Sequence, residues 1–140
     1  MLRSISIDDF MTRNPVTATP DLDLLVLVDQ LLEHGISGAP VVGDSGQVIG
    51  MVSEHDCLKT ILIGTYQGDV GGSVSDVMSS VVDTVLLGTS IVEAATQMVG
   101  SGRRRLPVVD GSGRLVGQVS RRDLLRAIRA YEIPEEDPAR

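Results

Sequence analysis

Gly50-Met51-Val52-Ser53-Glu54-His55-Asp56 is the stretch that decides the fold, because the chain repeats its pattern as Gly117-Gln118-Val119-Ser120-Arg121-Arg122-Asp123. The copies begin at residues 50 and 117, and the same offset of 67 residues aligns the rest of the chain without a gap. Further pairs at that offset are Ser6 with Ser73, Thr17 with Thr84, Gly35 with Gly102, and Pro40-Val41-Val42 with Pro107-Val108-Val109. A tandem repeat of this kind predicts two copies of one supersecondary unit.

Each half is predicted to run strand, helix, strand, strand, helix. Short β-branched runs followed by glycine turn clusters predict a hairpin, and the second strand of each hairpin passes through the motif serine into a closing helix. The expected strands and closing helices are residues 16–18, 39–42, 48–52 and 54–63 in the first half, and 83–85, 106–109, 115–119 and 121–130 in the second.

The central helix of each half shows apolar residues at helical spacing. Its stripe consists of Leu24, Leu25, Val28, Leu31 and Leu32 in the first half, and of Ile91, Val92, Ala95, Met98 and Val99 in the second. Asp21 is expected to begin the first of these helices and Gly35 to end it. The corresponding caps of the second are Ser90 with Glu93, and Gly102. Upstream, Ser6-Ile7-Asp8-Asp9 and Ser73-Val74-Ser75-Asp76 are typical of capping boxes that open short helical turns.

The repeat predicts an α/β (α+β) fold built from two βαββα units, residues 1–68 and 69–140. Each unit has about 60 residues, too few to bury a good core alone, so we expect the two to pack on one another about a pseudo-two-fold axis. The glycine-rich stretch 64–72 is the predicted linker between them. The acidic residues 134–138, with two prolines, are predicted to form a frayed tail.

Composition disfavours several classes of protein. No apolar run reaches the roughly 18 residues of a membrane span, and the N-terminus lacks the apolar segment of a signal peptide. A net charge of −7 and an aromatic content of 2% disfavour nucleic acid as a partner. The single cysteine, Cys57, excludes an intrachain disulfide and favours a cytoplasmic location. One Cys and two His do not suffice for an ordinary zinc site.

The repeated Pro-Val-Val before a glycine turn, with Gly-h-h-Ser-x-x-Asp (h apolar or Gln) after it, resembles a tandem pair of cystathionine β-synthase (CBS) domains, also called a Bateman module. The resemblance covers about residues 6–130. It implies an adenosine-containing ligand, such as AMP, ADP, ATP or S-adenosylmethionine, bound in two clefts between the paired domains, with no cofactor required. It also implies a homodimer, for which the apolar helices around 58–63 and 124–128 are the expected interface.

The resemblance also implies a role for each motif residue. The motif carboxylates would bind the ribose hydroxyls, and the motif serines would lie near ribose and phosphate. One cleft would combine Ser53 and Asp56 with Thr84, Val85, Arg103 and Arg104, and the other would combine Ser120 and Asp123 with Thr17, Ala18, Ile36 and Ser37. His55 and Arg122, next to the motif aspartates, are further candidate ligand contacts. Because the second repeat has two arginines where the first has Ser37-Gly38, the cleft of Asp56 and Arg104 is expected to bind nucleotides better.

These residue types suit that chemistry. An ionised carboxylate offers two acceptor oxygens to the hydroxyls of a cis diol. A serine at a helix start lies among unpaired backbone N–H groups that favour phosphate, and guanidinium groups fork onto phosphate oxygens. Simpler interpretations stay open. Ser-x-x-Asp after a strand is also a plain capping box, the arginine run is also a solvated basic edge, and Thr17 and Thr84 are also ordinary strand residues.

Together these patterns predict a regulatory adenine-nucleotide sensor that acts in trans on an unknown protein. The alternatives are a structural dimerisation module with vestigial clefts and an S-adenosylmethionine-binding module. An enzyme is disfavoured, because the sequence has no phosphate loop, nucleophile elbow or His-Glu-x-x-His motif. Residues 1–73 carry three basic and ten acidic residues, whereas residues 74–129 carry eight basic and five acidic ones. This asymmetry favours a head-to-tail dimer at short range.

Overall fold

The computed structural model describes residues 2–132, which form two compact units. The terminal unit comprises residues 2–14, 83–111 and 116–132, and the central unit comprises residues 15–82 and 112–115. The predicted frayed tail, 134–138, lies outside the described residues. No helix within residues 2–132 is long and apolar enough to cross a membrane.

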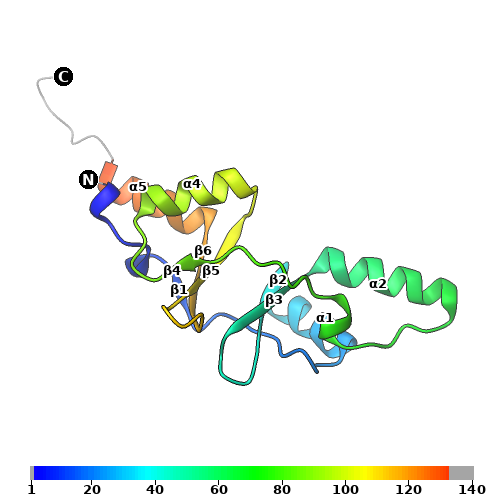
Figure 1. The fold of residues 1–140 in the computed structure, drawn as a ribbon. Coiled ribbons are helices and arrows are strands. Elements are labelled where there is room, and N and C mark those ends of the chain that lie inside the picture. Colours follow the sequence, from blue (N-terminus) through cyan, green and yellow to red (C-terminus); the bar gives the residue numbers. More distant parts are fainter. Residues whose placement is uncertain (1, 133–140) are drawn as a thin grey trace, which may run out of the picture. The chain divides into compact units, whose positions relative to one another are not determined.

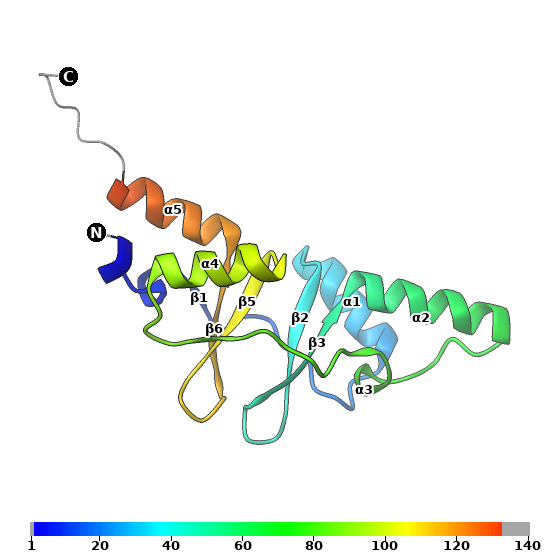
Figure 2. The same ribbon diagram turned by 45° about the horizontal axis from the view of Figure 1, so that its top comes forward.

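The terminal unit contains a four-stranded sheet in the order β1-β6-β5-β4. Its strands are β1 (Thr12–Arg13), β4 (Val85–Leu86), β5 (Arg105–Val109) and β6 (Leu115–Ser120). β1 is antiparallel to β6, and β4 is parallel to β5. The helices α4 (Ile91–Ser101) and α5 (Arg121–Glu132) lie side by side, next to the N-terminal 3₁₀ turns η1 (Leu2–Ser4) and η2 (Ile7–Asp9), as Figures 1 and 2 show.

The central unit is built on the hairpin of β2 (Gly38–Val42) and β3 (Val48–Ser53). Its helices are α1 (Leu24–His34), α2 (Glu54–Gln67) and the single turn α3 (Val74–Val77). α1 and α2 lie next to each other beside the hairpin (Figure 2). Ala18 bridges Val41 in parallel, and Ser79 bridges Met51 in antiparallel. At the offset of 67 residues, the first bridge corresponds to the pairing of β4 with β5 in the terminal unit, and the second corresponds to the pairing of β1 with β6.

The two repeats exchange their leading segments. Ile7 is fully buried in the core of the terminal unit, most of whose buried residues belong to the second repeat. Val74 is fully buried in the core of the central unit, whose other buried residues belong to the first repeat. Thr12 pairs with Gln118 of β6, and Ser79 pairs with Met51 of β3. The packing units therefore differ from a division of the chain at residues 68 and 69, because each leading segment packs on the hairpin of the other repeat.

The motif glycines make this exchange sterically possible. A Cβ placed on Gly117 would lie 2.7 Å from Thr12 O and 2.9 Å from Met11 Sδ. A Cβ on Gly50 would lie 2.7 Å from Met78 Sδ and 2.9 Å from Ser79 O. Cβ atoms essentially never approach other atoms this closely. The first residue of each motif is therefore glycine because the exchanged segment lies directly on it.

The predicted helices and hairpins are present, with shifts at their ends. Asp21 was the predicted cap of α1, but the N-cap is Asp23, whose Oδ2 accepts the N–H groups of Leu25 and Val26. Gly35 and Gly102 end α1 and α4 in the left-handed conformation, as predicted. Ser90 caps α4 by accepting the N–H of Glu93. The predicted capping box at Ser6 is instead a 3₁₀ turn in which Ser6 Oγ accepts the N–H of Asp8.

The predicted linker begins later than expected. α2 continues through Gly64 to Gln67, and Gly68 ends it with φ 79°. Gly64 is buried in this helix, and a side chain there would collide with Asp69 O. The connection between the repeats therefore starts at residue 68, because Gly64 serves close packing of the returning chain and does not break the helix.

The apolar stripes of the central helices were predicted only in part. The buried residues are Leu24, Leu27 and Leu31 in α1, and Ile91, Ala94 and Met98 in α4. Leu25, Leu32 and Val99 of the predicted stripes are exposed, with 71% of Leu32 and 83% of Val99 accessible. The face toward the core is thus rotated relative to the prediction, and each helix keeps a second apolar face outside the core of its unit.

Candidate functional site

The first motif lies at the junction of β3 and α2 in the central unit. Asp56 Oδ2 accepts the N–H of Ser53 at 3.0 Å and its hydroxyl at 2.9 Å, and Ser53 Oγ accepts the N–H of Asp56 at 3.2 Å. Both side chains are half-buried. Among residues 2–132, Asp56 Oδ1 has no hydrogen-bond partner. The motif therefore closes its helix with one carboxylate oxygen and keeps the other available.

The second motif, at the junction of β6 and α5, differs in this respect. Asp123 Oδ2 accepts the N–H of Ser120 at 2.8 Å, and Ser120 Oγ accepts the N–H of Asp123 at 3.1 Å. The other oxygen of Asp123, Oδ1, forms an ion pair with Arg126 Nη1 at 2.6 Å, and the Asp123 side chain is only 9% exposed. Both carboxylate oxygens of the second motif are thus engaged.

In the central unit, the other predicted residues lie on segments that adjoin the first motif. Ala18 donates to Pro40 O at 3.0 Å and accepts from Val42 N at 2.9 Å, which places Thr17 and Ala18 alongside β2. Ser37 O accepts the N–H of Glu54, the first residue of α2, at 2.8 Å. Ile36 precedes it and packs partly against the core. One unit therefore brings together the predicted segments 17–18, 36–37 and 53–56.

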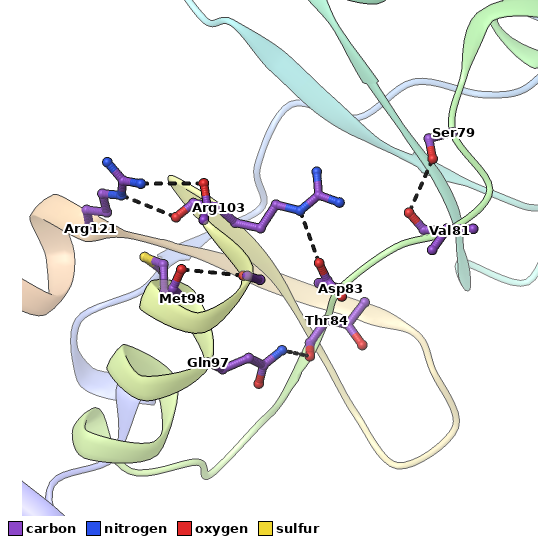
Figure 3. Close-up of polar contacts among 10 residues, drawn as sticks. Ser79, Val81, Asp83, Thr84, Gln97, Met98, Arg103 and Arg121 are labelled. Carbon is purple, nitrogen blue, oxygen red and sulfur yellow. Dashed lines mark hydrogen bonds and ion pairs between the residues drawn. The ribbon is translucent and has the colours of Figure 1, made fainter.

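The terminal unit arranges its own predicted residues in the same way. Val85 is buried and pairs with Val108, and Thr84 O accepts the side-chain amide of Gln97 at 2.7 Å (Figure 3). Arg104 O accepts the N–H of Arg121 at 2.9 Å, next to Ser120. The predicted combinations of Asp56 with Arg104, and of Asp123 with Ser37, join residues of different units and stay predictions.

Two predicted contacts have no partner that supports a role. His55 is exposed on the first turn of α2, and no hydrogen bond joins it to another described residue. Arg122 is exposed on α5, where it lines an open groove with Leu125, Arg126 and Arg129. Both side chains stay candidates by their place in the motif alone.

Two residues that form ion pairs with predicted site residues were not predicted from the sequence. Arg126 occupies Oδ1 of Asp123, and Asp83 forms an ion pair with Arg103, whose Nε lies 3.0 Å from Asp83 Oδ2. The repeat offset contained the signal for the second pair, because it aligns Asp83 with Val16 and Arg103 with Ile36. The second repeat thus has an acidic and a basic residue at two positions where the first repeat has apolar residues.

Burial changes the chemistry of the one cysteine. Cys57 follows the first motif aspartate and is buried in the core of the central unit. Burial, together with the charges of Asp56 and Glu54, raises the pKa of the Cys57 thiol above its ordinary value of 9.0. Cys57 is therefore a neutral thiol at physiological pH.

An open groove in the terminal unit is lined mainly by apolar side chains of α4 and α5. This groove, of about 410 Å³, lies along α4 and α5 and is lined by Ala95, Met98, Val99, Arg121, Leu124, Leu125 and Ile128. In the central unit, Leu58 and Leu62 of α2 are 69% and 60% exposed. Each unit therefore carries apolar helix surface that its own core does not cover.

Comparison with known proteins identifies one family whose model matches this chain twice. The family model of the CBS domain matches residues 7–63 and 74–130. The protein MK0525 of Methanopyrus kandleri is 32% identical over 126 residues, which cover 89% of this chain and 63% of that protein. MJ1426 of Methanocaldococcus jannaschii is 31% identical over 152 residues, covering 87% of this chain and 90% of that protein. The chain thus spans less than two thirds of MK0525 but most of MJ1426.

Among solved structures, CBSX2 of Arabidopsis thaliana in complex with AMP matches with a TM-score of 0.80 and 27% sequence identity. The match covers 92% of this chain and 99% of that one. The similarity extends over both repeats, so it supports a fold made of two paired CBS repeats.

Proposed function

The chain belongs to the CBS-domain family, and from that premise we propose that it is a regulatory module that binds an adenine nucleotide and acts in trans on another protein. AMP, ADP and ATP are the proposed ligands, with S-adenosylmethionine as the alternative. A cytoplasmic location and the absence of a catalysed reaction stay predictions from the sequence.

The observation that carries this proposal is the free oxygen of Asp56. A plain capping box needs one acceptor oxygen, and Asp56 Oδ2 already fills that role. Oδ1 stays available as an ionised acceptor for a ribose hydroxyl, in a half-buried position where such a bond is stronger than in water. The N–H groups of the first turn of α2, which lie beside Ser53, favour a phosphate group.

The similarity to CBSX2 supports the class of ligand, because that protein was crystallised with AMP. The difference between the two motifs supports a ranking. Asp123 has no free oxygen within the described part of the chain, so we propose that Asp56 provides the stronger ribose contact. This ranking agrees with the sequence prediction but rests on a different observation, the ion pair of Arg126.

Assembly is part of the proposal. The exposed Leu58 and Leu62 of α2 and the groove along α4 and α5 favour a homodimer, because apolar helix surface of this kind is rarely left in water. Nucleotide binding regulates a partner only if the ligand prefers one of two states of the dimer. A dimerisation module without a ligand is the second candidate function, and the same surface supports it.

The test is titration calorimetry and thermal unfolding with AMP, ADP, ATP and S-adenosylmethionine. A ligand at 100 times its Kd stabilises the fold by about 2.7 kcal/mol. Asp56→Asn keeps an acceptor for the Ser53 N–H but removes the charge, and it is expected to lower the affinity about tenfold or more. Asp76→Asn is the matched control, because Asp76 accepts the N–H and hydroxyl of Ser73 in the same way.

The control separates a cap from a ligand contact. Asp76→Asn is expected to change stability as Asp56→Asn does and to leave nucleotide affinity unchanged. No response to any of the four ligands favours the dimerisation module, and equal loss of affinity in both variants contradicts a direct role of Asp56.

A further inference from the structure

The ion pair between Asp83 and Arg103 has no role in the function proposed so far. Arg103 Nε lies 3.0 Å from Asp83 Oδ2, with 53% and 41% of the two side chains exposed. Asp83 directly precedes Thr84, and Arg103 directly precedes Arg104, so the pair lies among residues already predicted to contact a nucleotide. Both side chains belong to the terminal unit.

The backbone on both sides of this pair is held in place, as Figure 3 shows. Gln97 Nε2 donates to Thr84 O at 2.7 Å, which fixes the segment next to Asp83 to α4. Arg121 Nε donates to Arg103 O at 3.2 Å, at the C-terminal end of α4. The two charged side chains therefore start from anchored positions.

The contact uses only part of the guanidinium group. Asp83 accepts the Nε–H of Arg103, and within residues 2–132 the two terminal nitrogens have no hydrogen-bond partner. Those nitrogens are the ones that fork onto phosphate oxygens. Asp83 thus leaves the phosphate-binding end of Arg103 open but places a negative charge beside it.

The other repeat shows that the fold does not require this pair. The offset of 67 residues aligns Asp83 with Val16 and Arg103 with Ile36, so two apolar residues replace two charged ones. The surrounding pairing is the same in both halves, since Val85 pairs with Val108 as Ala18 does with Val41. The pair is therefore a property of one half, and the strand pairing that both halves share does not require it.

We propose that Asp83 is a specificity-determining residue, which lowers the affinity of Arg103 for phosphate in proportion to the negative charge of the ligand. The inference rests on the proposed nucleotide-binding function and names the residue that limits its preference for polyphosphates. The carboxylate repels a triphosphate more than a monophosphate at the same place, and it does not act on uncharged adenosine. Arg103 attracts all phosphate ligands, and Asp83 reduces the advantage of each additional phosphate.

The experiment compares Asp83→Asn with wild-type protein, using adenosine, AMP, ATP and inorganic tripolyphosphate. Asparagine keeps an acceptor for the Nε–H of Arg103 and removes only the charge. Asp83→Asn is expected to raise the affinity for ATP about fivefold and for AMP about twofold, with adenosine unchanged, which is the range of an exposed charge pair. Raising the salt concentration from about 50 mM to about 300 mM is expected to shrink both gains.

Two further variants make the result specific. Glu93→Gln changes the net charge of the same unit equally, and Glu93 forms no ion pair with any residue of the described chain. It is expected to leave the ratio of ATP to AMP affinity unchanged. Asp83→Glu retains the charge and is expected to retain the wild-type ratio. Thermal unfolding of each variant verifies that it is folded.

The Nε–H resonance of Arg103 in NMR spectra separates this inference from the proposed function. Tripolyphosphate is expected to shift that resonance at a severalfold lower concentration in Asp83→Asn than in wild type. If no adenosine ligand binds wild-type protein, the proposed function fails, and the tripolyphosphate response still decides the role of Asp83. The inference is overturned if wild type and Asp83→Asn respond equally to tripolyphosphate. It is also overturned if Asp83→Asn binds ATP more weakly than wild type, or if Glu93→Gln gains as much ATP affinity as Asp83→Asn.

Discussion

Arg126 Nη1 lies 2.6 Å from Oδ1 of Asp123, whereas Lys59, at the same position of the other repeat, forms no ion pair with Asp56 within the described chain. Both residues are basic and lie three positions after the motif aspartate, on the second turn of α5 and of α2. The longer, forked guanidinium group reaches the carboxylate and the ammonium group does not. Two motifs of one pattern thus present different acceptors to a ligand.

Removing Arg126 is expected to free Oδ1 of Asp123. In the background of Asp56→Asn, the substitution Arg126→Gln is expected to raise the remaining AMP affinity several-fold, because the second carboxylate regains an open acceptor. Calorimetric titration measures the change, with Arg129→Gln as the control of equal charge. A fall in affinity would instead show that Arg126 itself contacts the ligand.

The motif glycines are expected to tolerate no side chain. Gly117→Ala places a methyl group against Thr12 O and Met11, and overpacking of this kind destabilises by about 1–3 kcal/mol. Gly100→Ala is the matched control, because Gly100 lies within α4 with nothing near the added methyl group, and alanine there stabilises the helix by up to about 1 kcal/mol. Urea unfolding measures both. Equal stability of the two variants contradicts the close approach.

The exchange of leading segments predicts where a buried substitution acts. Ile7→Ala removes a fully buried side chain and is expected to destabilise the fold by about 2–5 kcal/mol. Its effect on amide hydrogen exchange is expected in α4 and β6, far along the sequence, and not in α1. Val74→Ala is the reciprocal variant, with its effect expected in α1 and β3. Faster exchange confined to the repeat that carries each substitution contradicts the exchanged packing.

Cys57 is expected to make the fold sensitive to alkali. Burial raises the pKa of this thiol in the folded protein, so the unfolded chain ionises at a lower pH. The stability contributed by the neutral thiol is fully present below about pH 9 and decreases as the pH rises through the folded pKa. Cys57→Ala is expected to lose less unfolding free energy than wild type as the pH rises above about 9. Urea unfolding at each pH measures the change, and an equal loss of unfolding free energy in wild type and Cys57→Ala would contradict this prediction.

Most of the local structure could be predicted from the repeat, because the turn clusters and the motif serines mark where each hairpin and closing helix begins. Asp21 and Asp23 both lie near the start of α1, and only the backbone conformation decides that Asp23 is the cap. The repeat also shows that Ile7 corresponds to Val74, but correspondence does not tell on which copy each residue packs. That choice depends on the path of the chain between the hairpins.

The capping contacts of the two motifs could be predicted from the sequence, whereas the ligand contacts of the candidate site stay predictions. Ser-x-x-Asp after a strand was expected to fit a capping box, and both motifs form one. The engagement of Asp123 by Arg126 depends on how a long side chain lies, which the pattern does not specify. The pairing of Asp83 with Arg103 joins residues 20 positions apart, and it emerges only once α4 and β4 are placed beside each other.

The exchanged segments also determine an order of events during synthesis. Ile7 is synthesised before its neighbours in the core of the terminal unit, among them Met98 and Leu106, which follow some 90 residues later. At about 5–20 residues per second, the segment around Ile7 waits several seconds for these partners. The leading segment of the first repeat is therefore buried only after the second repeat has been made, and its apolar side chains stay exposed until then.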